Sequence, residues 1–289
     1  MPWLESQGSA RSRGFMMRFC VLGSGSGGNA TLVEGGGALV LLDAGLGPRQ
    51  LAERLQSAGV DPASLDAVFV SHEHGDHSRG ATGFSAKWGV PLALTRGTLR
   101  AAGFATSRLP PCLEIAAGET RTIRRLAVRA VAVPHDAASP LAFVVSADDV
   151  SLGHATDLGH LSRGLVAAFR RCHAVLVESN YDPAMLRDGP YPWSLKERIL
   201  GPFGHLSNGD VGRLLEKGLG DSCRRVVLAH LSRTNNHPEL ALQAAEEALA
   251  RAGRRQVEVA LAPPEGTGWI AVRAPRGAPA RHEGQLRLF

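Results

Sequence analysis

The chain has 289 residues, of which 44% are apolar and 20% are charged, a composition that excludes a disordered chain and a fibrous repeat. No apolar run approaches the roughly 18 residues that a membrane-spanning helix needs, so we expect a soluble protein without a membrane partner. The formal net charge is +5 and only three of the 32 basic residues are lysines, which fits either a solvated arginine-rich surface or a polyanionic partner.

The amino-terminal residues 1–16 carry charge but lack the continuous apolar segment of a secretory signal. We interpret them as a disordered extension or as an over-long start of the chain. The four cysteines show no CxxC spacing, so we expect each to be a small core residue, with no disulfide scaffold and no thiolate zinc site. Together these features predict a cytoplasmic protein.

Predicted strands and helices follow one another from residue 17 onward. Short Val- and Leu-rich strands at 19–22, 30–34 and 38–43 are expected to pair antiparallel across glycine turns, and a helix at 48–58 follows them. Further predicted strands are 67–71, 91–95, 124–133, 141–146, 150–155, 174–178, 225–229, 256–261 and 269–273, and further predicted helices are 79–88, 98–102, 161–171, 207–217 and 238–252. Strand-rich halves with helices outside them favour two sheets packed face to face and flanked by helices.

The segment from Gly23 to Gly28 matches the GxGxxG pattern of dinucleotide-binding proteins and follows a predicted strand. Such a site needs a helix to begin at the glycines, so that its amide groups meet a pyrophosphate, but residues 29–33 have the pattern of a strand. We therefore interpret the segment as a tight glycine turn whose backbone approaches a ligand.

The strongest motif is the run HEHGDH at residues 72–77, which directly follows an apolar strand. In a short extended segment His72 and His74 point the same way, and Asp76 and His77 then turn towards a second centre. Imidazole and carboxylate groups suit zinc, manganese or iron, whereas a solvated loop of this composition is a rare alternative.

Other residues that can bind metals also stand at the ends of predicted strands: Asp43, His135, Asp157 and His230. Each alone is weak evidence, because a single histidine is usually a surface or core residue. As a series of strand-end residues, they predict one site assembled at one edge of the sheets.

The ordered set of Asp43, HxHxDH, His135, Asp157 and a late histidine resembles the metallo-β-lactamase superfamily over roughly residues 17–275. The resemblance implies an α/β fold, the four-layer αββα sandwich, and a site for two divalent metal ions, zinc or manganese. Asp43 would support the ligand loop by hydrogen bonds, as metal-bound imidazoles require. By position, the resemblance implies one metal held by His72, His74 and His135, a second held by Asp76, His77 and His230, and Asp157 as a bridge between them.

Two late histidines compete for the last ligand position. His230 ends an apolar strand and is assigned to the metal, whereas His205 precedes a helix at which Ser207 begins a predicted capping box. In the phosphodiesterase branch of the superfamily a histidine upstream of the last ligand is catalytic, and His205 resembles it, with Asp76 on the nucleophile side. Glu178 resembles the carboxylate that orients this histidine, although a strand-end surface glutamate is an equally weighted alternative.

Departures from neighbouring families narrow the function. Asp157 stands where class B β-lactamases of the commonest subclass place a cysteine, which argues against an antibiotic-degrading enzyme. The 21 residues between His135 and Asp157 leave no room for the arm with which bacterial tRNA 3′-processing enzymes hold tRNA, and the 47 residues between Asp157 and His205 leave none for a β-CASP insertion. The loops at the glycine turn and after both late histidines instead resemble the YycJ/WalJ-type DNA exonucleases, which implies 5′ to 3′ exonuclease activity and a role in mismatch repair.

The carboxyl terminus carries a feature that is independent of the fold. The tail at 276–289 is expected to be flexible, and its final QLRLF resembles the peptide with which bacterial replication and repair proteins bind the sliding clamp. Leu288 and Phe289 would enter an apolar groove beside Leu286, while Gln285 makes polar contacts. A chance amphipathic end is the alternative.

These features together favour a two-metal phosphodiesterase that acts on DNA from an end, in replication-linked or mismatch repair. Phosphate contacts are expected from arginines that the sequence does not identify and from Gly25, Ser26, Gly27, Asn29 and Ser207, so binding should depend on salt. The alternative is a small-molecule metallohydrolase that opens cyclic phosphates, lactones or thioesters. A clamp-binding accessory protein with a structural metal is disfavoured, because a structural zinc site needs only four ligands.

Overall fold

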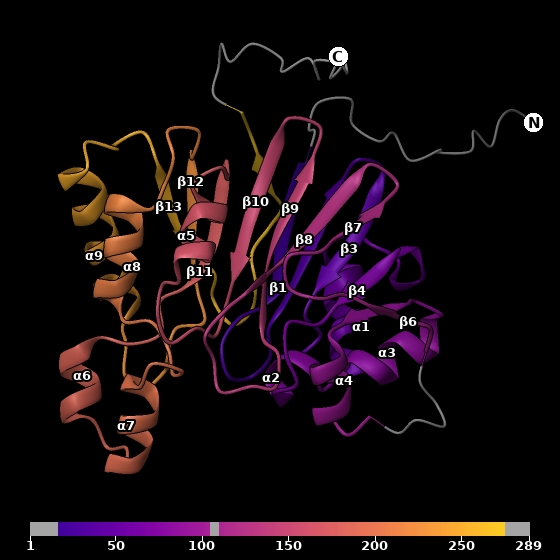
Figure 1. Ribbon diagram of the computed structural model, residues 1–289, viewed down its shortest axis with the longest axis horizontal. Coiled ribbons are helices and arrows are strands. Elements are labelled where there is room, and N and C mark those ends of the chain that lie inside the picture. Colours follow the sequence, from indigo (N-terminus) through magenta and orange to yellow (C-terminus); the bar gives the residue numbers. More distant parts are fainter. Residues whose placement is uncertain (1–16, 105–109, 275–289) are drawn as a thin grey trace, which may run out of the picture.

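The computed structural model of the protein describes residues 17–104 and 110–274. The predicted extension at 1–16 and the predicted tail at 276–289, with its clamp-like peptide, therefore lie outside the described residues. In the described part, two β-sheets stand face to face at the centre and helices lie on their outer faces (Figure 1).

The first sheet combines strands from the amino-terminal half of the chain with one strand near its end. Strands β14, β1, β2 and β3 pair antiparallel, as predicted for β1 to β3, and from β3 to β6 the strands run parallel. The carboxyl ends of β3 and β4 therefore lie at the same edge of the sheet. In spatial order the strands are β14 (Ile270–Val272), β1 (Met17–Gly23), β2 (Ala30–Gly35), β3 (Ala38–Leu42), β4 (Ala67–Phe69), β5 (Leu92–Leu94) and β6 (Cys112–Glu114).

The second sheet has the same mixed character. Strands β13 to β10 are parallel, whereas β10, β9, β8 and β7 pair antiparallel. The central strands are rich in Val, Leu and Ala and are buried almost throughout, as expected for strands that are covered on both faces. In spatial order the strands are β13 (Glu258–Leu261), β12 (Arg225–Ala229), β11 (Ala174–Glu178), β10 (Val150–Ala155), β9 (Leu141–Ala147), β8 (Leu126–Ala132) and β7 (Thr120–Ile123).

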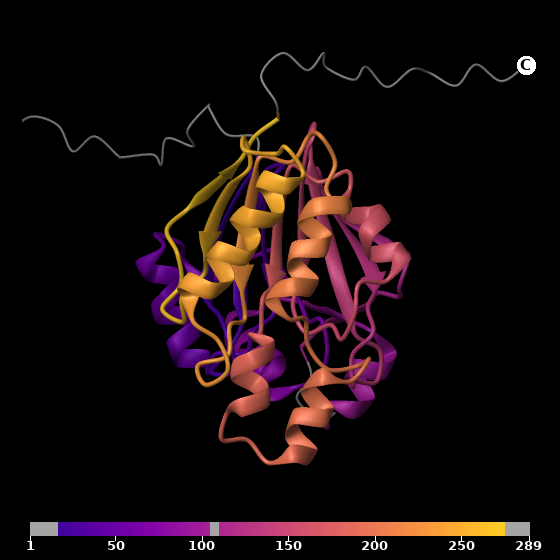
Figure 2. The ribbon, with the colours of Figure 1, turned by 90° about the vertical axis from the view of Figure 1, so that its left-hand side faces the viewer.

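Helices form the two outer layers. Helices α1 (Pro48–Ser57) and α3 (Ala81–Trp88) pack on the first sheet, and α4 (Arg96–Ala101) follows β5. Figure 2 shows α8 (Asn208–Lys217) and α9 (Pro238–Arg251) lying along the second sheet, which α5 (Arg163–Phe169) also covers. The short elements are η1 (Pro62–Ser64), α2 (Gly75–Ser78), α6 (Pro183–Asp188) and α7 (Trp193–Leu200). Among the described residues, no helix is long and apolar enough to cross a membrane.

Three apolar cores hold these layers together. Between the sheets, the buried rings of Phe69 and Phe143 meet edge to face, with centroids 5.8 Å apart. Each sheet also packs against its own helices, around Phe84 on one side and around Phe169 on the other. The predicted αββα sandwich is therefore confirmed. No β-CASP domain interrupts residues 158–204, all of which the structure describes.

The sequence did not predict six of these elements. The strands β6 and β7 are exposed along nearly their whole length and so lack an alternating apolar pattern. The elements η1 and α2 have three and four residues, too few to show a helical period, and α6 and α7 lie in a segment that Pro183, Gly189, Pro190 and Pro192 interrupt. The expectation that every cysteine is buried is wrong for Cys112, which lies on β6 and is exposed.

Candidate metal centre

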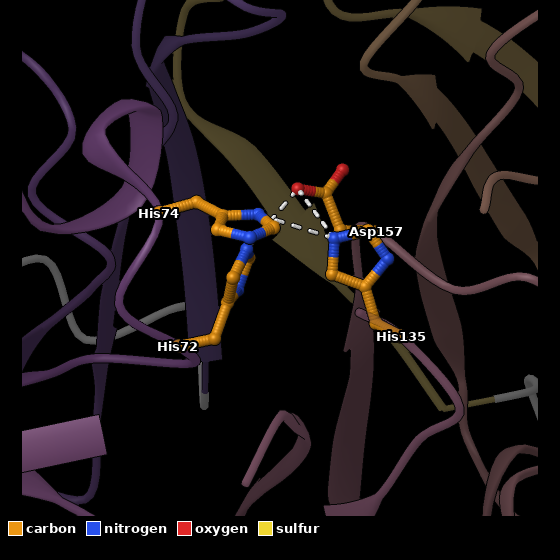
Figure 3. A group of neighbouring side chains, drawn as sticks. All are labelled: His72, His74, His135 and Asp157. Carbon is orange, nitrogen blue, oxygen red and sulfur yellow. Dashed lines mark hydrogen bonds and ion pairs between the residues drawn. The ribbon is translucent and has the colours of Figure 1, made fainter. Parts of the chain in front are cut away.

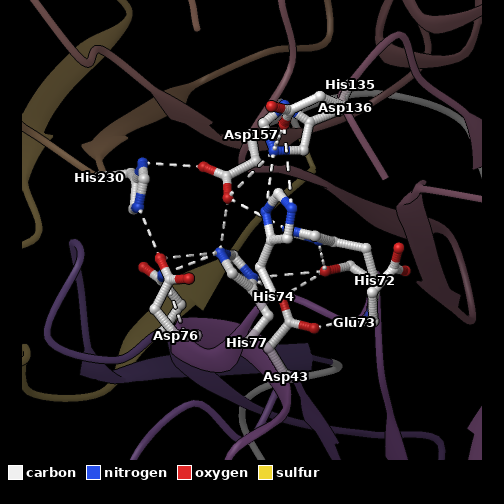
Figure 4. A network of polar contacts seen from close by, with 12 residues as sticks. Asp43, His72, Glu73, His74, Asp76, His77, His135, Asp136, Asp157 and His230 are labelled. Carbon is white, nitrogen blue, oxygen red and sulfur yellow. Dashed lines mark hydrogen bonds and ion pairs between the residues drawn. The ribbon is translucent and has the colours of Figure 1, made fainter. Parts of the chain in front are cut away.

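The predicted metal-binding residues come together at the carboxyl ends of strands from both sheets (Figure 4). Asp43 follows β3, the HEHGDH segment follows β4, and His230 follows β12. His135 and Asp157 stand after β8 and β10 and lie across from the HEHGDH segment. Since sequence-distant strands contribute to it, the centre exists only when both sheets are assembled.

The first ligand group comprises His72, His74, His135 and Asp157 (Figure 3). One nitrogen or oxygen from each lies within 4.8 Å of all the others. The His135 Nε2 atom is 3.3 Å from His74 Nδ1 and 3.7 Å from Asp157 Oδ2. These distances leave room for a cation that all four side chains can reach.

The second ligand group comprises Asp76, His77, Asp157 and His230, whose ligand atoms also lie within 4.8 Å of one another. His77 Nε2 is 2.9 Å from Asp157 Oδ2, and His230 Nδ1 is 2.9 Å from Asp157 Oδ1. His230 Nε2 is 3.4 Å from Asp76 Oδ2. Asp157 therefore belongs to both ligand groups, the position expected of a bridging ligand.

The backbone is strained at three residues of the centre. Asp43, Asp157 and His230 have φ angles of 62°, 58° and 54°, in the left-handed region that residues other than glycine seldom adopt. Asp43 and His230 directly follow a strand, and one residue separates Asp157 from the end of β10. At each of these positions the chain must turn sharply. Such conformations cost about 1–3 kcal/mol and persist where the surrounding structure enforces them, often at functional sites.

Asp43 contacts the HEHGDH segment and the residue before it. Its carboxylate accepts hydrogen bonds from the Ser71 amide at 2.7 Å and the Ser71 hydroxyl at 2.9 Å, and it lies 2.8 Å from His77 Nδ1. Burial opposes the charged form of His77, but Asp157 and Asp43 outweigh it and raise the pKa of His77 to about 10. The Asp43 contact to Nδ1 turns His77 Nε2 towards Asp157.

Glu178 and His205 form a pair beside the second ligand group. Glu178 is fully buried at the end of β11, so the alternative of a surface glutamate is wrong. One carboxylate oxygen accepts the Leu158 amide at 2.6 Å and the Leu206 amide at 3.2 Å, and the other lies 3.0 Å from His205 Nδ1. Burial opposes the charged form of His205, but Glu178 outweighs it and raises the pKa of His205.

His205 and Glu178 also sit close to the ligands themselves. His205 Nδ1 is 3.5 Å from Asp157 Oδ1, and Glu178 Oε2 is 3.5 Å from His230 Nδ1. The four side chains Asp157, Glu178, His205 and His230 offer ligand atoms within 4.8 Å of one another, so they form a third group with metal-binding chemistry. His205 remains partly exposed, unlike the other three.

The glycine turn is anchored to the centre. Asn29 accepts a hydrogen bond from the Gly25 amide at 2.9 Å, and its side-chain nitrogen lies 2.9 Å from His77 Nε2. Ser26 and Gly27 at the tip of the turn are exposed. No helix begins there, since β2 follows at once, which agrees with the rejection of a dinucleotide-binding site.

Ser207 lies two residues beyond His205 at the start of α8. Its hydroxyl accepts the Asp210 amide at 3.1 Å, and Asp210 bonds back to the Ser207 amide at 3.0 Å. This reciprocal arrangement is the predicted capping box.

Three further residues at the centre were not singled out from the sequence. Ser71 contacts Asp43, Asn180 donates to the His230 carbonyl at 3.0 Å, and Asp136 Oδ1 lies 3.2 Å from His135 Nε2. Ser71 and Asp136 are chain neighbours of predicted ligands, which was an available signal. Asn180 reaches His230 only through the fold, so no sequence signal identifies it.

The residues present fit divalent cations. The Nε2 atom of His72 is buried and makes no hydrogen bond, although Asp157 Oδ2 lies 3.3 Å away. A buried polar atom without a partner costs about 1–3 kcal/mol, which a coordinated cation would remove. The imidazole and carboxylate donors of both groups are those that zinc and manganese accept.

Comparisons with known proteins agree with this geometry. Residues 23–110 match the family model described as the metallo-β-lactamase superfamily. The chain is 33% identical over 241 residues to exodeoxyribonuclease WalJ of Streptococcus pneumoniae. The match covers 81% of this chain and 89% of that protein. It is 31% identical over 239 residues to exodeoxyribonuclease YycJ of Bacillus anthracis. This match covers 82% of this chain and 90% of that protein.

Solved structures share the fold at low identity. The metallo-β-lactamase fold protein YhfI from Bacillus subtilis superposes with a TM-score of 0.68 at 16% identity and covers 88% of this chain and 99% of its own. The short form of human tRNase Z superposes with a TM-score of 0.62 at 15% identity and covers 89% of this chain and 99% of its own. At these identities the likeness concerns the fold alone.

Proposed function

Since the chain belongs to the metallo-β-lactamase superfamily, in the branch that holds the WalJ and YycJ exonucleases, we propose that it is a DNA exonuclease that works with two divalent metal ions. Membership of this family identifies the chain as a metal-dependent hydrolase. The observation that carries the proposal is the pair of ligand groups that share Asp157 beside the His205–Glu178 pair.

The two ligand groups would each hold one cation. His72, His74 and His135 would bind the first, and Asp157 would contact both cations. Asp76, His77 and His230 would bind the second. Bound cations of this kind lower the pKa of water and neutralise the charge of a phosphate. The His and Asp donors suit zinc and manganese alike, so both are proposed.

Asp76 would orient the attacking water. Burial opposes ionisation of Asp76, but the contact with His230 and the charge of His77 lower its pKa to about 2, so its carboxylate is ionised at neutral pH. Asp76 is also more exposed than Asp157. Its carboxylate can therefore accept a hydrogen bond from a water molecule that approaches the phosphate from solvent.

His205 would act on the leaving group. Glu178 holds His205 by Nδ1 and favours its charged form, which leaves Nε2 available as a proton donor. Donation of this proton to the leaving oxygen, or stabilisation of the charge on the phosphate, would assist departure of the product. Glu178 is a positioning residue in this scheme.

Phosphates next to the cleaved bond would meet the glycine turn and the start of α8. The exposed tip of the turn offers backbone amide groups, and Asn29 holds the turn against the centre. The groups proposed for these contacts are Gly25, Ser26, Gly27, Asn29 and Ser207. Binding would weaken as salt rises, because each phosphate contact releases counterions.

End-labelled DNA tests the proposal. Wild-type protein with manganese should shorten single-stranded and duplex DNA stepwise from the 5′ end, whereas a variant with His74→Ala and Asp76→Ala should leave it intact. The control is His173→Gln, at the amino end of β11 and so away from Glu178. Equal cleavage by wild type and double variant would refute the site, and turnover of a small diester without any cleavage of DNA would favour a small-molecule hydrolase.

The biological role is proposed from the same resemblance. A 5′ to 3′ exonuclease fits replication-linked or mismatch repair, and the terminal QLRLF peptide would bring the enzyme to the sliding clamp. Replacement of Gln285 and Phe289 by Ala should abolish retention of the protein on immobilised clamp, while exonuclease activity on free DNA is retained. Undiminished retention would refute the assignment of Gln285, Leu286, Leu288 and Phe289 to clamp binding.

A further inference from the structure

Helix α7 and the residues after it hold one side of the first ligand group. The Asp136 amide donates to the Phe203 carbonyl at 3.1 Å, and His135 Nδ1 lies 3.0 Å from the Gly204 carbonyl. From α7 itself, Arg198 Nε donates to Asp136 Oδ2 at 2.6 Å. A single segment of the chain therefore fixes both a predicted ligand and the carboxylate that follows it.

The contacts of His135 decide which of its ring nitrogens faces a cation. Only a protonated nitrogen can donate to the Gly204 carbonyl, so Nδ1 carries the proton and Nε2 keeps its lone pair. This Nε2 lies 3.3 Å from His74 Nδ1 and 3.7 Å from Asp157 Oδ2. In the first ligand group, His74 therefore turns its Nδ1 atom towards the other donors.

The second ring nitrogen of His74 faces Asp136. An imidazole that binds a metal through Nδ1 carries its proton on Nε2, and metal-bound histidines almost always donate that proton to a carboxylate, a carbonyl or water. Asp136 Oδ1 lies 3.9 Å from His74 Nε2 and 3.2 Å from His135 Nε2 (Figure 4). Once a cation takes the lone pair of His135 Nε2, the proton on His74 Nε2 is the group to which Oδ1 can bond.

Arg198 determines where the Asp136 carboxylate points. Its guanidinium holds Oδ2, which leaves Oδ1 directed at the two histidines. The Arg198 and Asp136 side chains are 54% and 33% exposed, and an ion pair this open to solvent contributes little to stability. Helix α7 lies beyond the strand ends, at the end of the molecule where α2 lies (Figures 1 and 2). The consequence of the pair is therefore one of position: it links a helix outside the sandwich layers to the ligands.

We propose that Asp136 is the carboxylate that orients His74 at the first cation and that Arg198 is a positioning residue that acts through Asp136. This rests on the proposed function, because it concerns the first of the two proposed cations. It makes α7 a part of the first metal site and leaves the second ligand group unaffected. Loss of a partner that orients a metal-bound imidazole lowers metal affinity by about 10- to 100-fold, so the first cation should be lost selectively.

Manganese affinity, measured by competition with a chelator, tests the proposal without any substrate. Asp136→Ala should weaken the binding of one cation by about 10- to 100-fold and leave the other at its wild-type affinity. Arg198→Ala should weaken the same cation, and the double variant should bind it no more weakly than Asp136→Ala, because Arg198 acts only through Asp136. Arg198→Lys keeps a donor for Oδ2 and should recover part of the loss.

Arg124→Ala is the matched control. Arg124 pairs with Asp66 at 2.9 Å and is 59% exposed, much like Arg198. The two residues stand just before β8 and β4, at the strand ends opposite the metal centre. This variant loses an exposed ion pair of the same kind and should bind both cations as the wild type does.

Anomalous diffraction from crystals of Asp136→Ala at limiting manganese identifies the affected cation. The peak in the first ligand group should lose occupancy, whereas the peak in the second group should stay. Wild-type affinity for both cations in Asp136→Ala, a loss that falls on the second peak, or a double variant weaker than Asp136→Ala would overturn the proposal. A wild-type protein that binds both cations but degrades no DNA would refute the proposed exonuclease, and the affinities of the variants would still decide the role of Asp136 and Arg198.

Discussion

Asp157 shows how single residues build the centre. Its two carboxylate oxygens together lie within 3.7 Å of ring nitrogens of five histidines. The Oδ2 atom faces His72, His77 and His135, and the Oδ1 atom faces His205 and His230. Burial would raise the pKa of Asp157, but the charges of His230 and His77 hold it well below its usual range. The carboxylate is therefore ionised at any physiological pH, although it is buried.

At this scale the sequence predicted the ligands but not their surroundings. The HEHGDH run is contiguous, and the other ligands each follow an apolar strand, so their types and places were readable. Ser71, which contacts Asp43, directly precedes His72 and so had a signal in the sequence. Asn180 had none, because it meets His230 only in the folded chain. The left-handed backbone at Asp157 depends equally on its neighbours and has no signature in the sequence.

Asp43→Asn should weaken metal binding by about 10- to 100-fold, the usual cost of losing a partner that orients a metal-bound imidazole. The change removes the charge that faces His77 Nδ1 while the side chain keeps its size. Competition with a chelator measures the affinity. Glu53→Gln, on the exposed surface of α1, is the matched control, and an unchanged affinity in Asp43→Asn would show that Asp43 does not support the ligands.

The pH profile of kcat should report His205. If His205 gives the proton, kcat is full below the pKa of His205 and falls as pH rises through it. Glu178 raises that pKa after burial has opposed it, so Glu178→Gln should move the alkaline limb of the profile to lower pH. His205→Ala should lower kcat by about 10²- to 10⁴-fold. An alkaline limb that stays in place in Glu178→Gln would contradict the role of the pair.

At the scale of elements, the strands carried the clearest signals and the short helices the weakest. Runs of Val and Leu predicted every strand of the two sheets except β6 and β7, which lie at the sheet edges and are exposed. The region around α6 and α7 showed no helical pattern, because Pro183, Gly189, Pro190 and Pro192 interrupt it.

Ser207→Ala should lower the free energy of unfolding by about 1 kcal/mol, because it removes the side-chain cap of α8. Ser207→Thr keeps a hydroxyl and should restore most of that loss. Chemical denaturation measures both variants. A rise in the KM for DNA that accompanies the loss in Ser207→Ala would support phosphate binding by Ser207 in addition to its cap, whereas an unchanged unfolding free energy would contradict the capping role.

At the scale of the whole molecule, acidic and basic groups are segregated around the centre. Asp43, Asp157 and Glu178 are buried within it, while Arg79, near the Gly27 carbonyl, and Arg198, bonded to Asp136, are exposed. The modest net charge of the chain could not show this distribution.

One composite domain stays a prediction at this scale, which follows from the spread of the site residues from residue 43 to residue 230. The order of the strands in the second sheet was not predictable, since the parallel pairings of β10 to β12 depend on contacts between distant segments. The centre therefore forms as a property of the complete sandwich.

The most direct test of the claim that Asp157 joins two metal sites at one sheet edge is anomalous X-ray diffraction from crystals of the protein loaded with manganese. We predict two anomalous peaks, one in the first ligand group and one in the second, with Asp157 beside both. A single peak, or peaks that lie outside these groups, would contradict the claim.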